Sequence, residues 1–216
     1  MAKITLISIF FLLLSFLVLV RAVDFAKPTY RRHSRTRVFV KEQCQTTRYP
    51  KLCVHCLSSH VSFSTTQNHQ QLAHIALLKV SLVRANYART YLINVATQLK
   101  QVKAKEYQTI KDCLDQINDG VRQLTKSVKE MPKINVEDDE YGFVWYKSNV
   151  QSWASAALTD TLTCMDGFSG YPMGGKTRAI VKAKVLNVAQ VTSNALALFN
   201  RYVAKQRATY SHKPQP

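Results

Sequence analysis

The chain is poor in residues that shape turns and in acidic side chains. Its 216 residues include 6 glycines and 6 prolines, too few for the many turns of a β-sandwich or β-barrel. Charged residues make up 20% of the chain, which argues against a long exposed coiled coil. Hydrophobic residues reach 46%, which excludes wholesale disorder and allows one compact domain. Because 13 acidic residues face 30 lysines and arginines, the formal net charge is +17.

Motifs for catalysis, metals and cofactors are also missing. No G-x-S-x-G motif occurs, and the six histidines lack the spacing of metal ligands. The stretch Cys53–Cys56 lacks the second pair of ligands that zinc would need. Gly170–Thr177 fits the P-loop pattern, but no β-rich segment precedes it, and we interpret it as a connection between helices. The sequence therefore predicts a binding protein, not an enzyme, without catalytic residues, metal or cofactor.

The N-terminal segment has the pattern of an export signal. An apolar run from Ile4 to Val20, flanked by Lys3 and Arg21, predicts a secretory signal peptide over residues 1–22. The run is close to the roughly 18 residues of a membrane span, so a signal anchor is the alternative. After removal of the leader, no membrane attachment is expected. The sequence therefore predicts an extracellular protein.

Basic segments are expected on both sides of the folded domain. Residues 23–37 predict a basic flexible arm, residues 38–204 the domain, and residues 205–216 a basic flexible tail. A basic patch suits nucleic acid, but an exported chain is not expected to meet it. An acidic polysaccharide is the expected anionic partner of the two segments.

Apolar side chains at intervals of three and four residues predict four long helices. The helices cover about residues 72–102, 107–128, 144–165 and 181–202, the second ending before Pro132. The first stripe consists of Ala76, Val80, Val83, Tyr87, Tyr91, Val95, Leu99 and Val102. The fourth consists of Val181, Val185, Val188, Thr192, Ala195, Phe199 and Tyr202. Four such helices predict an all-α, antiparallel up-and-down four-helix bundle.

The cysteines predict disulfides and one free thiol, as is usual in an exported domain. There are five: Cys44, Cys53, Cys56, Cys113 and Cys164. The midpoint between Cys113 and Cys164 falls in the acidic turn Glu137–Glu140, so an antiparallel hairpin places these two side by side. A bridge across this loop would contribute about 4 kcal/mol. Cys44 can close a short loop with Cys53 or with Cys56, and the spacing leaves both pairings open.

Several motifs together resemble the plant invertase and pectin methylesterase inhibitor family. They are Cys44-x8-Cys53 with Tyr49-Pro50 in its loop, Lys111-Asp112-Cys113, the segment 150–168 around Trp153 and Cys164, and Ser193–Leu198. The resemblance covers about residues 38–203. It implies export to the plant cell wall (the apoplast) and a four-helix bundle with an N-terminal helical hairpin. It also implies the disulfides Cys44–Cys53 and Cys113–Cys164.

The resemblance points to the pectin methylesterase side of this family. Invertase inhibitors typically carry Pro-Lys-Phe before the fourth cysteine, where this chain has Lys147-Ser148-Asn149, whereas Trp153–Thr159 resembles the esterase inhibitors. The resemblance implies a free inhibitor that forms a 1:1 complex with pectin methylesterase and covers its pectin-binding cleft without covalent chemistry. The alternatives are an inhibitor of cell-wall or vacuolar invertase and a basic structural wall protein that binds acidic pectin through its arm and tail.

Acidic residues gather near the predicted Cys113–Cys164 bridge. Asp112, Asp115 and Asp119 follow i, i+3, i+7 and share one helical face, and they would also complement a helix dipole. The third helix brings further acidic and hydroxyl side chains beside them. By the resemblance, the inhibitor interface is assigned to Asp115, Asp119, Thr159, Asp160, Thr163 and Asp166.

Overall fold

The computed structural model consists of helices. It describes residues 35–61, 68–102, 106–134, 140–168 and 175–211, and these hold no β-strand. The predicted signal peptide, residues 23–34 of the predicted arm and residues 170–174 of the P-loop-like segment lie outside this part of the chain. The prediction of an all-α protein is confirmed for the described residues.

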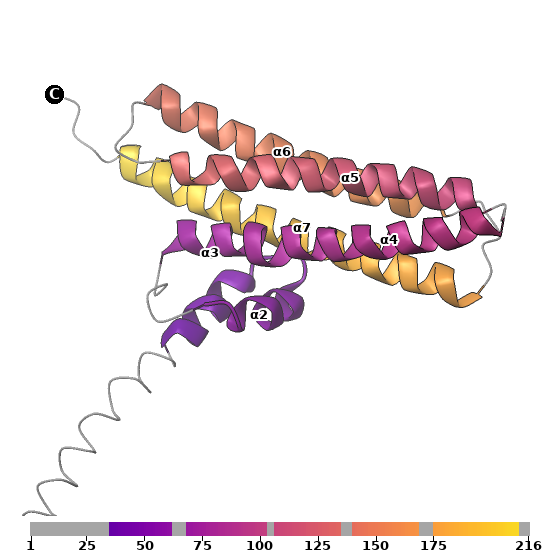
Figure 1. The fold of residues 1–216 in the computed structure, drawn as a ribbon. Coiled ribbons are helices and arrows are strands. Elements are labelled where there is room, and N and C mark those ends of the chain that lie inside the picture. Colours follow the sequence, from indigo (N-terminus) through magenta and orange to yellow (C-terminus); the bar gives the residue numbers. More distant parts are fainter. Residues whose placement is uncertain (1–34, 62–67, 103–105, 135–139, 169–174, 212–216) are drawn as a thin grey trace, which may run out of the picture.

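Four long helical rods pack side by side (Figure 1). The first rod comprises α3 (His69–Ile75), η2 (Ala76–Leu82) and α4 (Val83–Gln101). The others are α5 (Tyr107–Glu130), α6 (Glu140–Asp166) and α7 (Gly175–Ser211), with a 3-10 turn, η3 (Met131–Lys133), after α5. Successive rods run in opposite directions, and α7 closes the bundle against α4 and α6. Since α7 reaches Ser211, the helix extends into the segment expected to be a tail.

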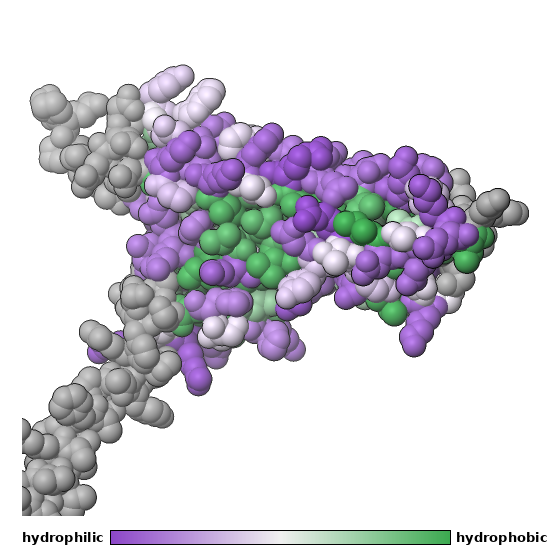
Figure 2. Space-filling view, viewed as in Figure 1, coloured by the Kyte–Doolittle hydropathy of each residue, from purple (hydrophilic) through white to green (hydrophobic). Residues whose placement is uncertain are grey.

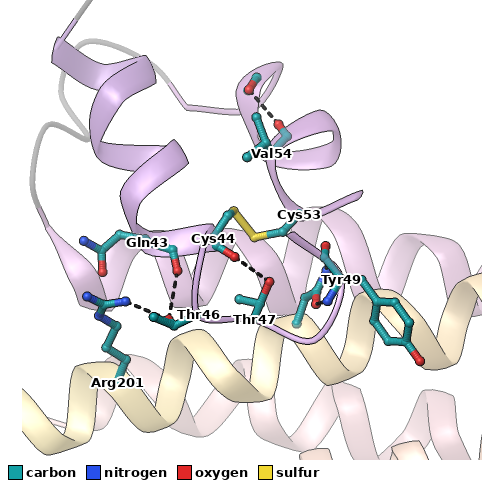
Figure 3. Close-up of a disulfide and its surroundings, with 10 residues drawn as sticks. Gln43, Cys44, Thr46, Thr47, Tyr49, Cys53, Val54 and Arg201 are labelled. Carbon is teal, nitrogen blue, oxygen red and sulfur yellow. Dashed lines mark hydrogen bonds between the residues drawn. A yellow bond between two sulfur atoms is a disulfide. The ribbon is translucent and has the colours of Figure 1, made fainter. Parts of the chain in front are cut away.

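An N-terminal helical hairpin packs against α7. Its helices, residues 35–44 and α2 (Pro50–Ser58), are joined by the Cys44–Cys53 disulfide, whose Cα atoms are 5.6 Å apart (Figure 3). The hydroxyl of Thr47 donates to the Cys44 carbonyl at 2.8 Å and closes the turn. Arg201 of α7 donates to the Thr46 hydroxyl at 2.7 Å. A disulfide therefore joins the two helices of the hairpin, and a hydrogen bond from Arg201 connects the hairpin to α7.

Asn194 of α7 fixes the start of α2 with two hydrogen bonds. Its Oδ1 accepts from the Tyr49 N–H at 3.0 Å, and its Nδ2 donates to the Tyr49 carbonyl at 3.0 Å. The Asn194 side chain is buried, at 4% exposure. Buried backbone groups need partners, so this one side chain satisfies both polar groups of the residue that precedes α2.

The fourth predicted stripe forms the centre of the bundle, because all seven of its residues on α7 are buried. Core side chains of α5, among them Ile110, Ile117 and Leu124, are buried on the facing rod. On one face of the molecule apolar side chains reach the surface over α3 and η2, between α5 and α2 (Figure 2). Elsewhere this face is largely hydrophilic.

The first predicted stripe is wrong in its middle part and at its last residue, Val102, which is 74% exposed. Val83 and Tyr87 were expected to face inward, but they are 40% and 67% exposed, whereas Ala85 and Ala88 are buried. The cause is η2, a π-helix whose wider turns shift the buried face by one residue along the chain. The buried Ser81 hydroxyl donates to the carbonyl of Ala76, five residues earlier, within this wide turn. The local sequence pattern did not predict this π-helical turn.

We expect Asn194→Ala to lower the free energy of unfolding by about 1–3 kcal/mol, because the Tyr49 N–H loses its partner, while the Tyr49 carbonyl keeps the Cys53 N–H as a donor. The matched control is Gln151→Ala, which removes the exposed hydrogen bond to Asn200 and should cost about 0.5 kcal/mol or less. Urea unfolding measures both variants. Equal losses for the two variants would contradict the role assigned to Asn194.

Candidate functional site

The pair α5–α6 is the most extensive helix contact in the structure. The Cys113–Cys164 disulfide joins the N-terminal part of α5 to the C-terminal part of α6, with the Cα atoms 4.3 Å apart. Further along, a Cβ built on Gly120 would lie 3.5 Å from the Ala157 carbonyl oxygen. A residue larger than alanine at position 120 would push the helices apart. A covalent bond and a small-residue contact therefore hold the two helices in one register.

A cleft of about 330 Å³ lies beside this disulfide. It is lined by Gln108, Thr109, Asp112, Cys113 and Gln116 of α5, by Thr163 and Cys164 of α6, and by Gly167. Within the cleft, Gln108 Nε2 donates to the Asp112 carboxylate at 2.7 Å. The two helices thus contribute side chains to a single concave surface.

The acidic side chains continue along the α5–α6 surface beyond the cleft. Asp119 forms an ion pair with Arg122 one turn further on α5. The Cβ position of Gly120 is 3.8 Å from Cβ of Asp160, which places Asp160 directly across from α5. The Asp160 Oδ2 atom is buried and has no hydrogen-bond partner among the described residues. This carboxylate oxygen is therefore buried without a hydrogen-bond donor in the described part of the chain.

Burial raises the pKa of Asp160 above its ordinary value of 3.8, and the positive charge of Arg122 offsets part of that rise. The two threonines of the surface are engaged differently. The hydroxyl of Thr159 donates to the Ser155 carbonyl at 3.2 Å, and that of Thr163 donates to the Thr159 carbonyl at 3.0 Å. Since their protons are used inside α6, both hydroxyl oxygens face outward as acceptors. The surface thus presents carboxylates and acceptors to a partner that carries donors.

Of the six residues nominated from the sequence, only Thr163 lines the cleft, beside Asp112, which was placed on the same helical face but not nominated. Asp119 and Asp160 lie further along the α5–α6 surface. Asp115, Thr159 and Asp166 are exposed on α5 and α6 but do not line the cleft. Sequence reasoning missed Gln108 and Gln116, although their spacing of four residues on either side of Asp112 indicates one helical face.

The remaining cysteine and the titratable side chains show no metal site in the described part of the chain. Cys56 is a free thiol on the buried side of α2. In the described part of the chain, no group of three or more His, Cys, Asp or Glu side chains is placed to hold a metal ion. No helix there is both long enough and apolar enough to span a membrane.

Fold and surface together define a helical, disulfide-bonded binding protein. The model of the plant invertase/pectin methylesterase inhibitor family matches residues 38–198, well over half of the chain. The chain therefore belongs to this family. Membership of an inhibitor family supports the expectation that the chain is not itself an enzyme.

Individual relatives agree with this assignment. The chain is 42% identical over 177 residues to Pectinesterase inhibitor 9 of Arabidopsis thaliana, covering 82% of this chain and 86% of the relative. It is 41% identical over 169 residues to the 21 kDa protein of Daucus carota, covering 78% of this chain and 86% of the relative. A crystal structure of a mutant pectin methylesterase inhibitor from Arabidopsis superposes with a TM-score of 0.56 at 18% identity, over 73% of this chain and 92% of that one. This last likeness concerns the fold.

The buried carboxyl of Asp160 predicts a pH-dependent stability. Because its folded pKa lies above the unfolded value, the ionised form destabilises the fold, and this cost appears as the pH rises above 3.8. We expect Asp160→Asn to be more stable than the parent at neutral pH, with the difference vanishing below pH 3.8. Unfolding free energies measured across this pH range test it. Asp115→Asn, an exchange on the exposed surface of α5, should change stability little at any pH.

Proposed function

We propose that this chain is a secreted inhibitor that binds a pectin methylesterase in a 1:1 complex and occludes the cleft in which that enzyme binds pectin. The observation that supports it most is the acidic α5–α6 surface, in a chain 42% identical to a protein named Pectinesterase inhibitor 9. The interface comprises the nominated residues Asp115, Asp119, Thr159, Asp160, Thr163 and Asp166, together with Asp112 in the cleft.

Rigidity makes this surface suited to occlusion. The disulfide and the Gly120–Ala157 contact fix α5 against α6, so little conformational entropy is lost when a partner binds. The α5–α6 surface offers carboxylates and hydroxyl acceptors, which would complement hydrogen-bond donors and cations in the cleft of a partner enzyme. Inhibition is then steric and reversible, without a covalent step.

The two alternative functions predict different partners. The invertase alternative is not favoured, because the relative of highest identity reported above is named a pectinesterase inhibitor. A structural wall protein would act through basic termini and would inhibit nothing. The deciding experiment is a parallel titration of the purified chain against a pectin methylesterase and a cell-wall invertase. We expect stoichiometric inhibition of the esterase at one chain per enzyme and no inhibition of the invertase; the opposite pattern would overturn the proposal.

Charge reversal on the α5–α6 surface should weaken the complex. We expect Asp119→Lys to lower the affinity for pectin methylesterase by about 10-fold or more, because an attractive contact of the carboxylate with the enzyme would become a repulsive one. Glu42→Lys is the matched control, since it makes the same charge change at an exposed position on the N-terminal helix, away from α5 and α6. Isothermal titration without pectin measures both. Equal affinities for the two variants would remove Asp119 from the interface.

A further inference from the structure

Acidic residues are absent from two of the four helical rods. The rod over residues 69–101 and helix α7 contain no Asp or Glu, yet they carry four and seven lysines and arginines, respectively. By contrast, α5 and α6 together hold seven acidic residues against five basic ones. The charges of the bundle are therefore segregated by helix, and the proposed inhibitor surface occupies only the acidic pair.

Aromatic rings and cations alternate where α4 meets α7. The ammonium of Lys184 on α7 lies 5.0 Å from the ring centroid of Tyr91 on α4. Tyr87, one turn earlier on α4, is 67% exposed, and the side chain of Arg84 is exposed as well. Contacts of this kind, on rings that remain accessible, mark a surface at which cations and π-faces can act together on one ligand.

The N-terminal hairpin extends this surface along α7. The guanidinium of Arg48 lies 5.7 Å from the ring centroid of Tyr49, and Tyr49 is hydrogen-bonded to Asn194 of α7. Asn194 follows Lys184 by ten residues, which corresponds to about 15 Å along the helix. We call Arg48, Tyr49, Arg84, Tyr87, Tyr91 and Lys184 the cationic face. It is elongated along α7 and contains two cation–aromatic pairs.

We propose that the cationic face binds an anionic polysaccharide, the carboxylate-bearing chain that remains when methyl esters are removed from pectin. Lysine and arginine bind carboxylates through charge-assisted hydrogen bonds. The exposed faces of tyrosine rings carry negative charge density and pack against the C–H groups of sugar rings. Neither α4 nor α7 has an acidic side chain that would repel such a polymer. Lys184 lies about 15 Å along α7 from Asn194, which holds Tyr49 beside Arg48, and cations spread along the helix in this way suit a ligand that repeats its charge along a chain.

The choice of polymer rests on the proposed function. An esterase that hydrolyses methyl esters converts a neutral polymer into a polyanion, so carboxylates accumulate where that enzyme has acted. The cationic face lies on α4, α7 and the hairpin, whereas the esterase is proposed to bind α5 and α6. Both surfaces can therefore be occupied at the same time, and the inhibitor is retained on polymer that has already been demethylated.

Binding of the purified chain to polygalacturonate oligomers, measured by calorimetry at low ionic strength, tests this proposal. We expect Arg84→Gln with Lys184→Gln to weaken binding by about 10-fold, since exposed charges act strongly when little salt screens them. Tyr87→Ala should weaken it by about 3-fold through loss of ring contact alone. The matched control is Lys41→Gln with Lys129→Gln, which removes the same charge from exposed positions on the N-terminal helix and α5. It should change binding less than about 2-fold.

Three outcomes would overturn the proposal. Equal weakening by the control pair would mean that only net charge matters, and unchanged binding of the first pair would mean that other segments hold the polymer. Equally tight binding of fully methyl-esterified pectin would exclude carboxylate recognition. Direct titration of the esterase without polymer is a separate readout, and the Arg84 and Lys184 variants should bind the enzyme as the parent does. Loss of esterase binding by the parent itself would count against the proposed function, not against the polymer contact.

Discussion

The antiparallel register of α5 and α6 is the constraint on which the proposed inhibitor surface depends. Asp112 and Thr163 are far apart in sequence, and they line one cleft because the Cys113–Cys164 bond joins the two helices beside it. The close approach at Gly120 then sets the separation of the helices further along, where Asp160 lies opposite α5. Burial of Asp160 follows from this approach, and so does the rise in its pKa. The packing of α5 against α6 thus raises the pKa of a carboxyl group on the proposed inhibitor surface.

A bundle of four rods has room for two surfaces of opposite character. Each rod shows one side to the core and the other to solvent, so the exposed sides of different rods can evolve separately. In this chain the acidic residues are concentrated on α5 and α6, while α7 and the rod before α5 are basic throughout. The segregation also keeps the α5–α6 surface acidic in a chain whose net charge is +17.

Much of the fold could be predicted because helical periodicity reflects burial directly. The stripe on α7 succeeds residue by residue, since that helix is regular and central. The stripe on the first rod fails at Val83 and Tyr87, because a π-turn depends on tertiary packing that local periodicity does not reveal. At the site, the spacing of Asp112 and Asp119 places them on a shared face of α5. Which acid faces α6 and which faces solvent depends on the angle between the helices, and the sequence does not contain that angle.

The wide turn of η2 also bears on how chains of this fold can gain or lose residues. The π-helix makes the segment from Ala73 to Ala88 one residue longer than a regular α-helix that would place the same core side chains inward. Insertion or deletion of a single amino acid inside a packed helix ordinarily disrupts core packing, since every side chain beyond it rotates by about 100° around the helix axis. Between Ala76 and Leu82 the rod already absorbs such a change, so alignments of this chain with shorter homologues should place their gap there rather than in a loop.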